Sequence, residues 1–244
     1  NKRIYRKSRG RCQPLKSGSF IKEMYLNDKE NINIDCDKIR KEAVKLFHKG
    51  LVHQGEGEQI RAEECFLLAR KNIIDFIPLC HPNISDYHQF INVESNLKDI
   101  PIAPEDTLIV RFCIEKIKHF ISDSQDKEYR YYWRFELSNA LGWWYLNREN
   151  DSKRALEEFL EAAKDEKHRQ MPYIYGNFGA GMIYKDMYLA TKREEYARKA
   201  CMHLEEYKKW REKVMPQKGT ELYKRVQQEM GWVRKWMKEM GVAR

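Results

Sequence analysis

The chain has 244 residues, enough for one large domain or two small ones. Hydrophobic residues make up 42% and charged residues 34%, which is typical of a helical protein with a substantial core and charged outer faces. No stretch approaches the roughly 18 uninterrupted apolar residues that a membrane-spanning helix requires, so the sequence predicts no membrane span.

The net charge of +9 is concentrated at the beginning of the chain. Residues 1–22 contain eight basic residues and no acidic one, which leaves a charge of +1 for the rest. A basic arm of this kind is usually a solvated terminus. The alternatives are an organelle-targeting segment and contacts with RNA phosphates or an acidic partner through Lys2, Arg3, Arg6, Lys7, Arg9 and Arg11. With the polar stretch that follows, the arm and linker are predicted over 1–36.

The six cysteines form no CxxC pair and are scattered along the chain: Cys12, Cys36, Cys65, Cys80, Cys113 and Cys201. Several fall at apolar helical positions, where a cysteine packs as a small hydrophobic residue. The pattern favours reduced thiols and an intracellular protein of the cytoplasm or nucleus, with an organelle as the alternative.

From residue 37 onward, apolar residues recur every three or four positions, as they do in amphipathic helices. Helices are predicted over 37–54, 58–76, 105–122, 128–148, 151–166, 171–189, 193–214 and 217–241. The candidate N-caps are Asp37, Asp151 or Ser152, and Thr220, and Pro172 suits a first helical turn. The stretch 78–104 holds four of the seven prolines, which predicts an irregular insertion, with a short helix near 86–92 as an alternative.

Three of the predicted helices share a small residue, a second residue four positions later and a third residue three beyond that. These triplets are Ala62–Phe66–Ala69, Ala155–Phe159–Ala162 and Ala197–Cys201–Leu204. Each triplet follows a helix that contains a glycine, namely Gly50, Gly142 and Gly181. Small residues allow two helices to approach closely, and the bulky residue fills the gap to the next pair.

This pattern resembles the tetratricopeptide repeat (TPR), most closely in the first pair, where Gly50, Gly57, Ala62, Phe66 and Ala69 fall at the consensus offsets. The resemblance covers 37–76 and 128–214, and it is weakest where Cys201 and Leu204 replace the preferred residues. It implies an all-α fold, a right-handed superhelical array of antiparallel helix pairs over 37–244. Such a TPR-like α-solenoid requires a cap, which we assign to 217–241.

The resemblance also implies a concave groove, lined by the first helix of each pair. Counted from the glycines, its residues are Phe47, Leu51, Asn139, Trp143, Tyr175, Phe178, Met182 and Lys185. Apolar and aromatic side chains suit a peptide or a helix, since burying each one contributes about 1.5–3 kcal/mol. Family members that clamp a C-terminal carboxylate place an asparagine where this chain has Leu51, Trp143 and Met182, so that ligand is not expected. Alternatively, these residues form the core of a short array, or the arm itself fills the groove.

The last predicted helix carries an apolar stripe that packs either on the preceding pair as a cap or on a partner helix. The candidate helix-docking residues are Val226, Met230, Val233 and Met237.

Catalytic and metal-binding motifs are weak in this sequence. Cys80, His81 and His88 lack a fourth ligand at a recognisable spacing, and His48 and His53 fall on different helix faces. We therefore expect no metal, no cofactor, no small-molecule substrate and no enzymatic activity. The sequence favours a protein–protein interaction scaffold or adaptor that binds a peptide or helix within a larger complex. The alternative is an RNA-binding component of a ribonucleoprotein, with the mixed Arg and aromatic stretch 129–135 as a stacking surface.

Overall fold

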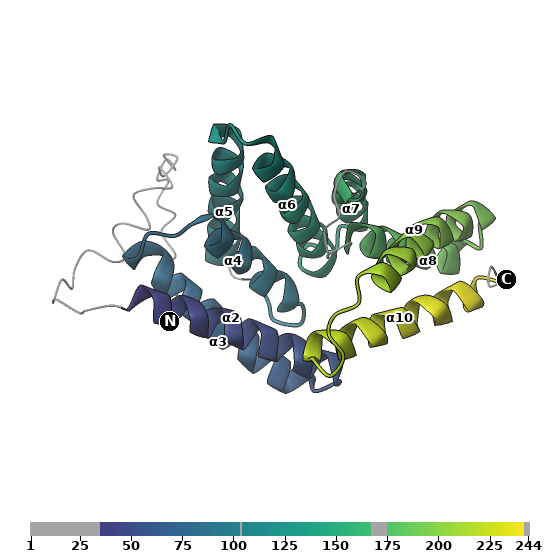
Figure 1. Cartoon of the computed structure of the whole chain (residues 1–244), viewed down its shortest axis with the longest axis horizontal. Helices are drawn as coiled ribbons and strands as arrows, with labels where there is room; N and C mark the ends of the chain where they lie inside the picture. Colours follow the sequence, from purple (N-terminus) through teal and green to yellow (C-terminus); the bar gives the residue numbers. More distant parts are fainter. Residues whose placement is uncertain (1–34, 103, 167–174, 242–244) are drawn as a thin grey trace, which may run out of the picture. The chain divides into compact units, whose positions relative to one another are not determined.

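The computed structural model describes residues 35–102, 104–166 and 175–241, except for the side chains at 165, 166, 221 and 222. This part of the chain contains nine α-helices and no strand. In chain order (Figure 1) they are α2 (Cys36–Gly55), α3 (Gln59–Leu79), α4 (Ile84–Asn96), α5 (Pro104–Asp123), α6 (Lys127–Asn147), α7 (Ser152–Glu166), α8 (Tyr175–Thr191), α9 (Glu194–Lys213) and α10 (Glu221–Glu239). The all-helical prediction is confirmed for these residues. None of the nine is both long enough and apolar enough to cross a membrane.

Helices that follow one another along the chain pack together as pairs. The pairs are α2 with α3, α4 with α5, α6 with α7, and α8 with α9. The first helices of neighbouring pairs also contact one another, α2 with α4, α4 with α6, and α6 with α8. This order of contacts is consistent with an α-solenoid.

The stretch 78–104 is not irregular throughout, because 84–96 forms α4, a longer version of the short helix considered near 86–92. Asn83 caps this helix by accepting from the Asp86 backbone N–H at 3.2 Å, while the Asp86 carboxylate accepts from the Asn83 N–H at 2.8 Å. The apolar side chains Phe90, Ile91 and Val93 are fully buried. Prolines flank the helix and do not interrupt it, so α4 and α5 add a further pair between the first and second pairs of the sequence pattern.

Each glycine of the sequence pattern lies against a bulky side chain in the next helix. The contacts are Gly50 with Phe66, Gly142 with Phe159, and Gly181 with Leu204. A Cβ atom at these glycines would lie 2.5, 2.5 and 2.7 Å from the facing side chain, closer than carbon atoms approach without displacement. Glycine therefore sets the distance between the helices of these three pairs. In the third pair the contact is made by Leu204, and not by Cys201, which occupies the aromatic position of the triplet.

Polar caps define where three helices begin. Asp35 caps α2 by accepting from the Lys38 backbone N–H at 3.0 Å, so Asp37 lies in the first turn and is not the cap. Asp151 accepts from the Arg154 N–H at 3.0 Å at the start of α7, and Thr220 caps α10. Pro172, which was predicted to lie in a first helical turn, is outside the described residues.

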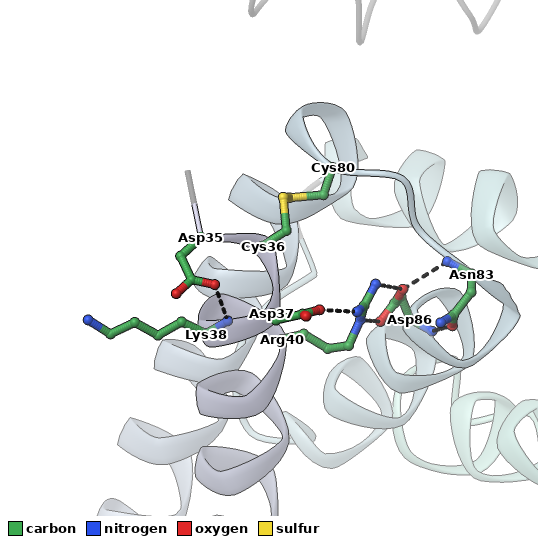
Figure 2. Close-up of a disulfide and its surroundings, with 8 residues drawn as sticks. All are labelled: Asp35, Cys36, Asp37, Lys38, Arg40, Cys80, Asn83 and Asp86. Carbon is green, nitrogen blue, oxygen red and sulfur yellow. Dashed lines mark hydrogen bonds and ion pairs between the residues drawn. A yellow bond between two sulfur atoms is a disulfide. The ribbon is translucent and has the colours of Figure 1, made fainter. Parts of the chain in front are cut away.

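A disulfide joins Cys36, the first residue of α2, to Cys80, which directly follows α3 (Figure 2). The prediction of reduced cysteines is therefore wrong for this pair, whose members are 44 residues apart in sequence. The described free cysteines are buried, at Cys65, Cys113 and Cys201, and Cys12 lies outside the described residues. Next to the disulfide, Arg40 of α2 donates from Nε to Asp86 of α4 at 2.8 Å. The disulfide thus links α2 to α3 at the end of the pair opposite to their connecting turn. The ion pair of Arg40 with Asp86 links the same end to α4.

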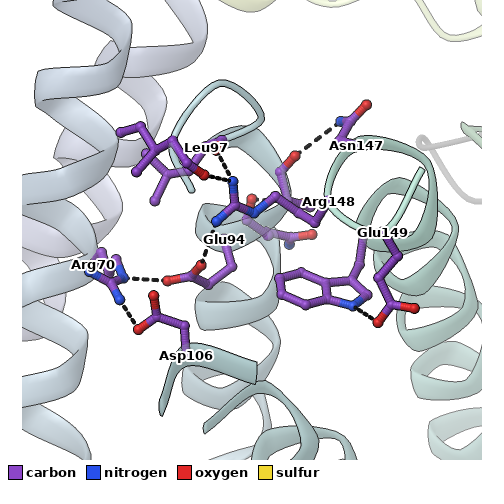
Figure 3. A network of polar contacts seen from close by, with 11 residues as sticks. Arg70, Glu94, Leu97, Asp106, Asn147, Arg148 and Glu149 are labelled. Carbon is purple, nitrogen blue, oxygen red and sulfur yellow. Dashed lines mark hydrogen bonds and ion pairs between the residues drawn. The ribbon is translucent and has the colours of Figure 1, made fainter. Parts of the chain in front are cut away.

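A buried ionic network connects four helices (Figure 3). The carboxylate of Glu94 in α4 is fully buried and accepts a hydrogen bond from Arg70 of α3, which also pairs with Asp106 of α5. Arg148, at the end of α6, lies 3.8 Å from Glu94 and donates to the backbone carbonyls of Leu97 and Ile100. Burial raises the pKa of Glu94, and the two arginines oppose this shift. The network fixes α4 against its neighbours.

Candidate binding site

The predicted groove residues are mostly occupied by contacts within the chain. Phe47 and Phe178 are buried, and the other six are partly buried: Leu51, Asn139, Trp143, Tyr175, Met182 and Lys185. Trp143, for example, packs its ring 5.0 Å from that of Phe159 and 6.4 Å from that of Phe178, measured between centroids.

The C-terminal helix α10 covers the predicted groove at the third of the patterned pairs. The Trp236 ring lies 5.7 Å from the Phe178 ring, and the Lys185 ammonium lies 4.3 Å from the centre of the Trp236 ring. The predicted docking stripe faces the same way, with Val226, Met230 and Val233 buried and Met237 partly buried in one cluster with Phe178. The predicted groove and the predicted stripe therefore pack on each other in this part of the chain.

Five side chains form a polar cluster where α10 meets α8 and α9. Glu229 accepts hydrogen bonds from Tyr207, from Tyr175 at 3.3 Å and from Arg225 at 3.0 Å. Arg211 lies 3.6 Å from the same carboxylate, and its guanidinium stacks 5.0 Å from the Tyr175 ring centre. Burial, followed by the negative charge of Glu229, raises the pKa of the Tyr207 phenol. These directional contacts define the position of α10 along the pair.

An open cleft of about 460 Å³ lies between the C-terminal half of α2 and the beginning of α10. The residues that line it are His48, Leu51, Val52 and Gly55 from α2, Glu56 directly after α2, and Lys224, Arg225 and Gln228 from α10. Gln228 donates from Nε2 to the Gly55 carbonyl at 2.6 Å and joins the two walls. Leu51 is the predicted groove residue that lines this cleft, which is therefore our candidate binding site.

The two walls of the cleft differ in chemistry. The α2 wall offers the apolar side chains of Leu51 and Val52, and the α10 wall offers the cations Lys224 and Arg225. Burial, with a further contribution from the positive charge of Arg225, lowers the pKa of His48, so this imidazole is neutral at pH 7. The arrangement can hold an apolar group and an anionic group side by side.

The turn between α2 and α3 brings together His53, Glu56 and Glu58, whose potential ligand atoms all lie within 4.8 Å of one another. His53 Nδ1 lies 2.7 Å from a Glu58 oxygen, and Arg61 donates to Glu58 at 2.8 Å. The hydrogen bond from Arg61, followed by that from His53, lowers the pKa of Glu58. Ion pairs within the turn account for this cluster, and we assign no metal to it.

The other histidine cluster of the sequence is not assembled as a metal site. Cys80 is bonded to Cys36, and His88 lies in the interface of α4 with α6, 3.4 Å from the Glu136 carboxylate. Burial lowers the pKa of His88 to about 4 and raises that of Glu136 to about 7. The pair contributes to packing and does not border the cleft.

The candidate nucleic-acid residues are only partly described. The six basic arm residues lie outside the described residues. In the stretch 129–135, Trp133 and Phe135 are buried, whereas Tyr129 and Tyr131 are exposed.

Comparison of the chain with protein-family models, with curated protein sequences and with solved structures finds no match. The tetratricopeptide resemblance therefore rests on the glycines and bulky residues of the chain itself.

Proposed function

We propose that the described helices form a right-handed, TPR-like superhelix of antiparallel pairs, with α10 as its cap. Three helix pairs support this arrangement, because in each a glycine of the first helix faces a bulky residue of the second. The contacts of α2 with α4, of α4 with α6 and of α6 with α8 support a single layer of first helices, as the resemblance implies. The burial of Val226, Met230 and Val233 supports the capping role of α10.

Within this architecture the chain acts as a non-catalytic scaffold that binds a peptide or short helix of a partner protein within a larger complex. The cleft between α2 and α10 carries the proposal, because it combines an apolar wall with a volume of about 460 Å³. That volume accommodates a few side chains of an extended or helical segment. The site lies at the Leu51 end of the predicted groove, since α10 covers Phe178 and Lys185 at the other end.

Val52→Glu tests this function, because it places a carboxylate on the apolar wall of the cleft. Val44→Glu is the matched control, since Val44 lies on the same helix, is exposed and does not line the cleft. The measurement is affinity purification after nuclease treatment, followed by mass spectrometry, with circular dichroism as a check on folding. We expect partner proteins to be retained by wild type and Val44→Glu and lost with Val52→Glu. Equal recovery by both variants would contradict a binding role for the cleft.

RNA binding is the second candidate, and the exposed face of α10 favours it. Trp232 is 41% exposed, and the exposed cation Lys235 lies three residues further along α10 on the same side of the helix. A tryptophan beside a cation can stack on a base while the cation contacts a phosphate. RNA affinity should then fall steeply as salt rises and should be lost when residues 1–22 are deleted. Affinity that is independent of salt and of the arm would rule this candidate out.

A further inference from the structure

We infer that the cleft between α2 and α10 selects an acidic peptide segment. In this inference, a carboxylate of the ligand binds Lys224 and Arg225, while a neighbouring apolar side chain packs on Leu51 and Val52. The inference rests on the proposed function, peptide binding, and adds to it the charge of the ligand and the position of its anionic group.

The cations of the cleft are neighbours on one helix and face an apolar wall on another. Lys224 is exposed, and Arg225 remains 35% exposed although it donates to Glu229 at 3.0 Å. The hydrogen bond to Glu229, a residue that is 4% exposed at its side chain, fixes the direction of the Arg225 side chain. A guanidinium that is oriented in advance loses less conformational entropy when it binds a carboxylate.

The α2 wall adds little positive charge to the cleft. Burial, followed by the positive charge of Arg225, lowers the pKa of His48 on this wall, which disfavours its protonated form. Glu56, which is exposed at the rim, is the acidic residue among those that line the cleft. The lining thus holds two cations and one carboxylate, and although Glu229 behind Arg225 offsets part of its charge, the rim favours an anionic ligand.

The lining favours a peptide over a nucleic acid. Single-stranded RNA is typically held by stacking of its bases on aromatic side chains. Among the described residues that line the cleft there is no Phe, Tyr or Trp, whereas Leu51 and Val52 provide aliphatic surface. An acidic segment that carries Leu, Ile or Val beside Asp or Glu matches both walls.

Three fluorescein-labelled synthetic peptides test the inference on the full chain by fluorescence anisotropy. They share the same leucine positions and differ in the remaining positions, which are acidic, neutral or basic. We expect the acidic peptide to bind about tenfold more tightly than the neutral one, and the basic peptide to bind most weakly. The preference for the acidic peptide should shrink as salt is added.

Charge reversals at the rim locate the interaction. Lys224→Glu should weaken binding of the acidic peptide about tenfold, and Glu56→Lys should strengthen it several-fold. Lys238→Glu is the matched control, because it makes the same change of charge on the same helix at an exposed position that does not line the cleft. It should leave the affinity within about twofold of wild type. All three side chains are exposed, so their replacement should not alter folding.

The outcomes separate the two proposals. If the neutral peptide binds as tightly as the acidic one and loses affinity with Val52→Glu, the charge preference is overturned and peptide binding stands. If none of the three peptides binds, both proposals are overturned. If Lys238→Glu weakens binding as much as Lys224→Glu, the attraction is general and the cleft is not the site. If a single-stranded RNA binds in a Lys224-dependent way and the peptides do not, nucleic acid replaces the acidic peptide as the ligand.

Discussion

Single glycines determine how closely the helices of this protein approach. Gly142 illustrates the constraint, because a Cβ atom there would lie 2.5 Å from the Phe159 ring, and Phe159 is fully buried. The ring has no exposed side toward which it could move without displacing other core atoms.

Gly142→Ala should therefore destabilise the protein by about 1–3 kcal/mol, because the added methyl group overpacks the core. Gly231→Ala is the control, since α10 is exposed there and no described atom lies within 4 Å of the added Cβ. That change should be neutral or stabilise by up to about 1 kcal/mol, because alanine favours a helix. Urea denaturation measures both. A Gly142→Ala protein as stable as wild type would show that the contact is not limiting.

His88 and Glu136 should make opposite contributions to the pH dependence of stability. Burial depresses the pKa of His88 from 6.5 to about 4, so its contribution is present above pH 6.5 and is lost as pH falls through 4. Burial raises the pKa of Glu136 from 4.5 to about 7, so its contribution is present below pH 4.5 and is lost as pH rises through 7. Between pH 4.5 and 6.5 the two contributions oppose each other.

Removing either group should expose the contribution of the other. For Glu136→Gln, the free energy of unfolding relative to wild type should increase with pH between 4.5 and 7. For His88→Asn, it should decrease with pH between 4 and 6.5. Each change should reach up to about 3 kcal/mol, the equivalent of a shift of about 2.5 pKa units. Urea unfolding at a series of pH values measures these slopes, and curves that run parallel to wild type would contradict the assignment.

The residues that the sequence predicted best are those with a fixed spacing. The glycines and the small residues of the triplets could be found because close helix contacts require a particular size at a particular interval. The sequence did not predict the buried charged residues Glu94, Arg211 and Glu229, because charged residues in helices usually lie on solvated faces. For Glu229 the spacing did indicate burial, since this residue falls on the same helix face as the apolar Val226 and Val233. Partners from other helices decide whether such a residue is buried, and periodicity does not report them.

Among the elements, α4 shows where sequence patterns are insufficient. The stretch 78–104 contains prolines and short polar residues, which usually indicate a loop. Its helix depends on the capping box of Asn83 and Asp86 and on the burial of Phe90 and Ile91 by neighbouring helices. Such tertiary contacts override local propensity, and the same reason explains why the pairing of Cys36 with Cys80 could not be read from their spacing.

The first helix pair should depend on its disulfide for stability. Cys36→Ser with Cys80→Ser should lower the free energy of unfolding by about 2–4 kcal/mol, because the crosslink restricts the unfolded chain over a separation of 44 residues. Thermal denaturation with and without reductant measures the effect. Reductant should destabilise wild type and leave the double variant unchanged. An equal response of both proteins would point to another cause.

Across the described helices, the buried hydrophobic residues form separate clusters, and each cluster is built from helices that are adjacent in the array. One extends from α2 to α6, and another joins α8, α9 and α10. In an array whose units contact mainly their neighbours, a local defect should weaken the nearest units most.

Val233→Asp should therefore increase amide hydrogen exchange more in α8–α10 than in α2–α4. Val233 is fully buried, so the new carboxylate would lose its hydration without a partner. Arg234→Asp is the control, since it introduces the same residue at the adjacent, exposed position. Exchange followed by mass spectrometry, region by region, makes the measurement. Equal loss of protection from α2 to α10 would show that the array unfolds as one unit.

The link between Cys36 and Cys80 also sets a mechanical limit on the chain. If a single molecule is stretched from residues outside the crosslink, tension passes through the sulfur–sulfur bond and bypasses α2, α3 and the turn between them. Those helices can unfold under heat or denaturant, but the pulling force cannot extend them. The fully stretched oxidised chain should be shorter than the reduced chain by about 150 Å, given about 3.4 Å for each extended residue. The first helix pair is thereby shielded from force, while every pair that follows it along the chain is exposed to the pull.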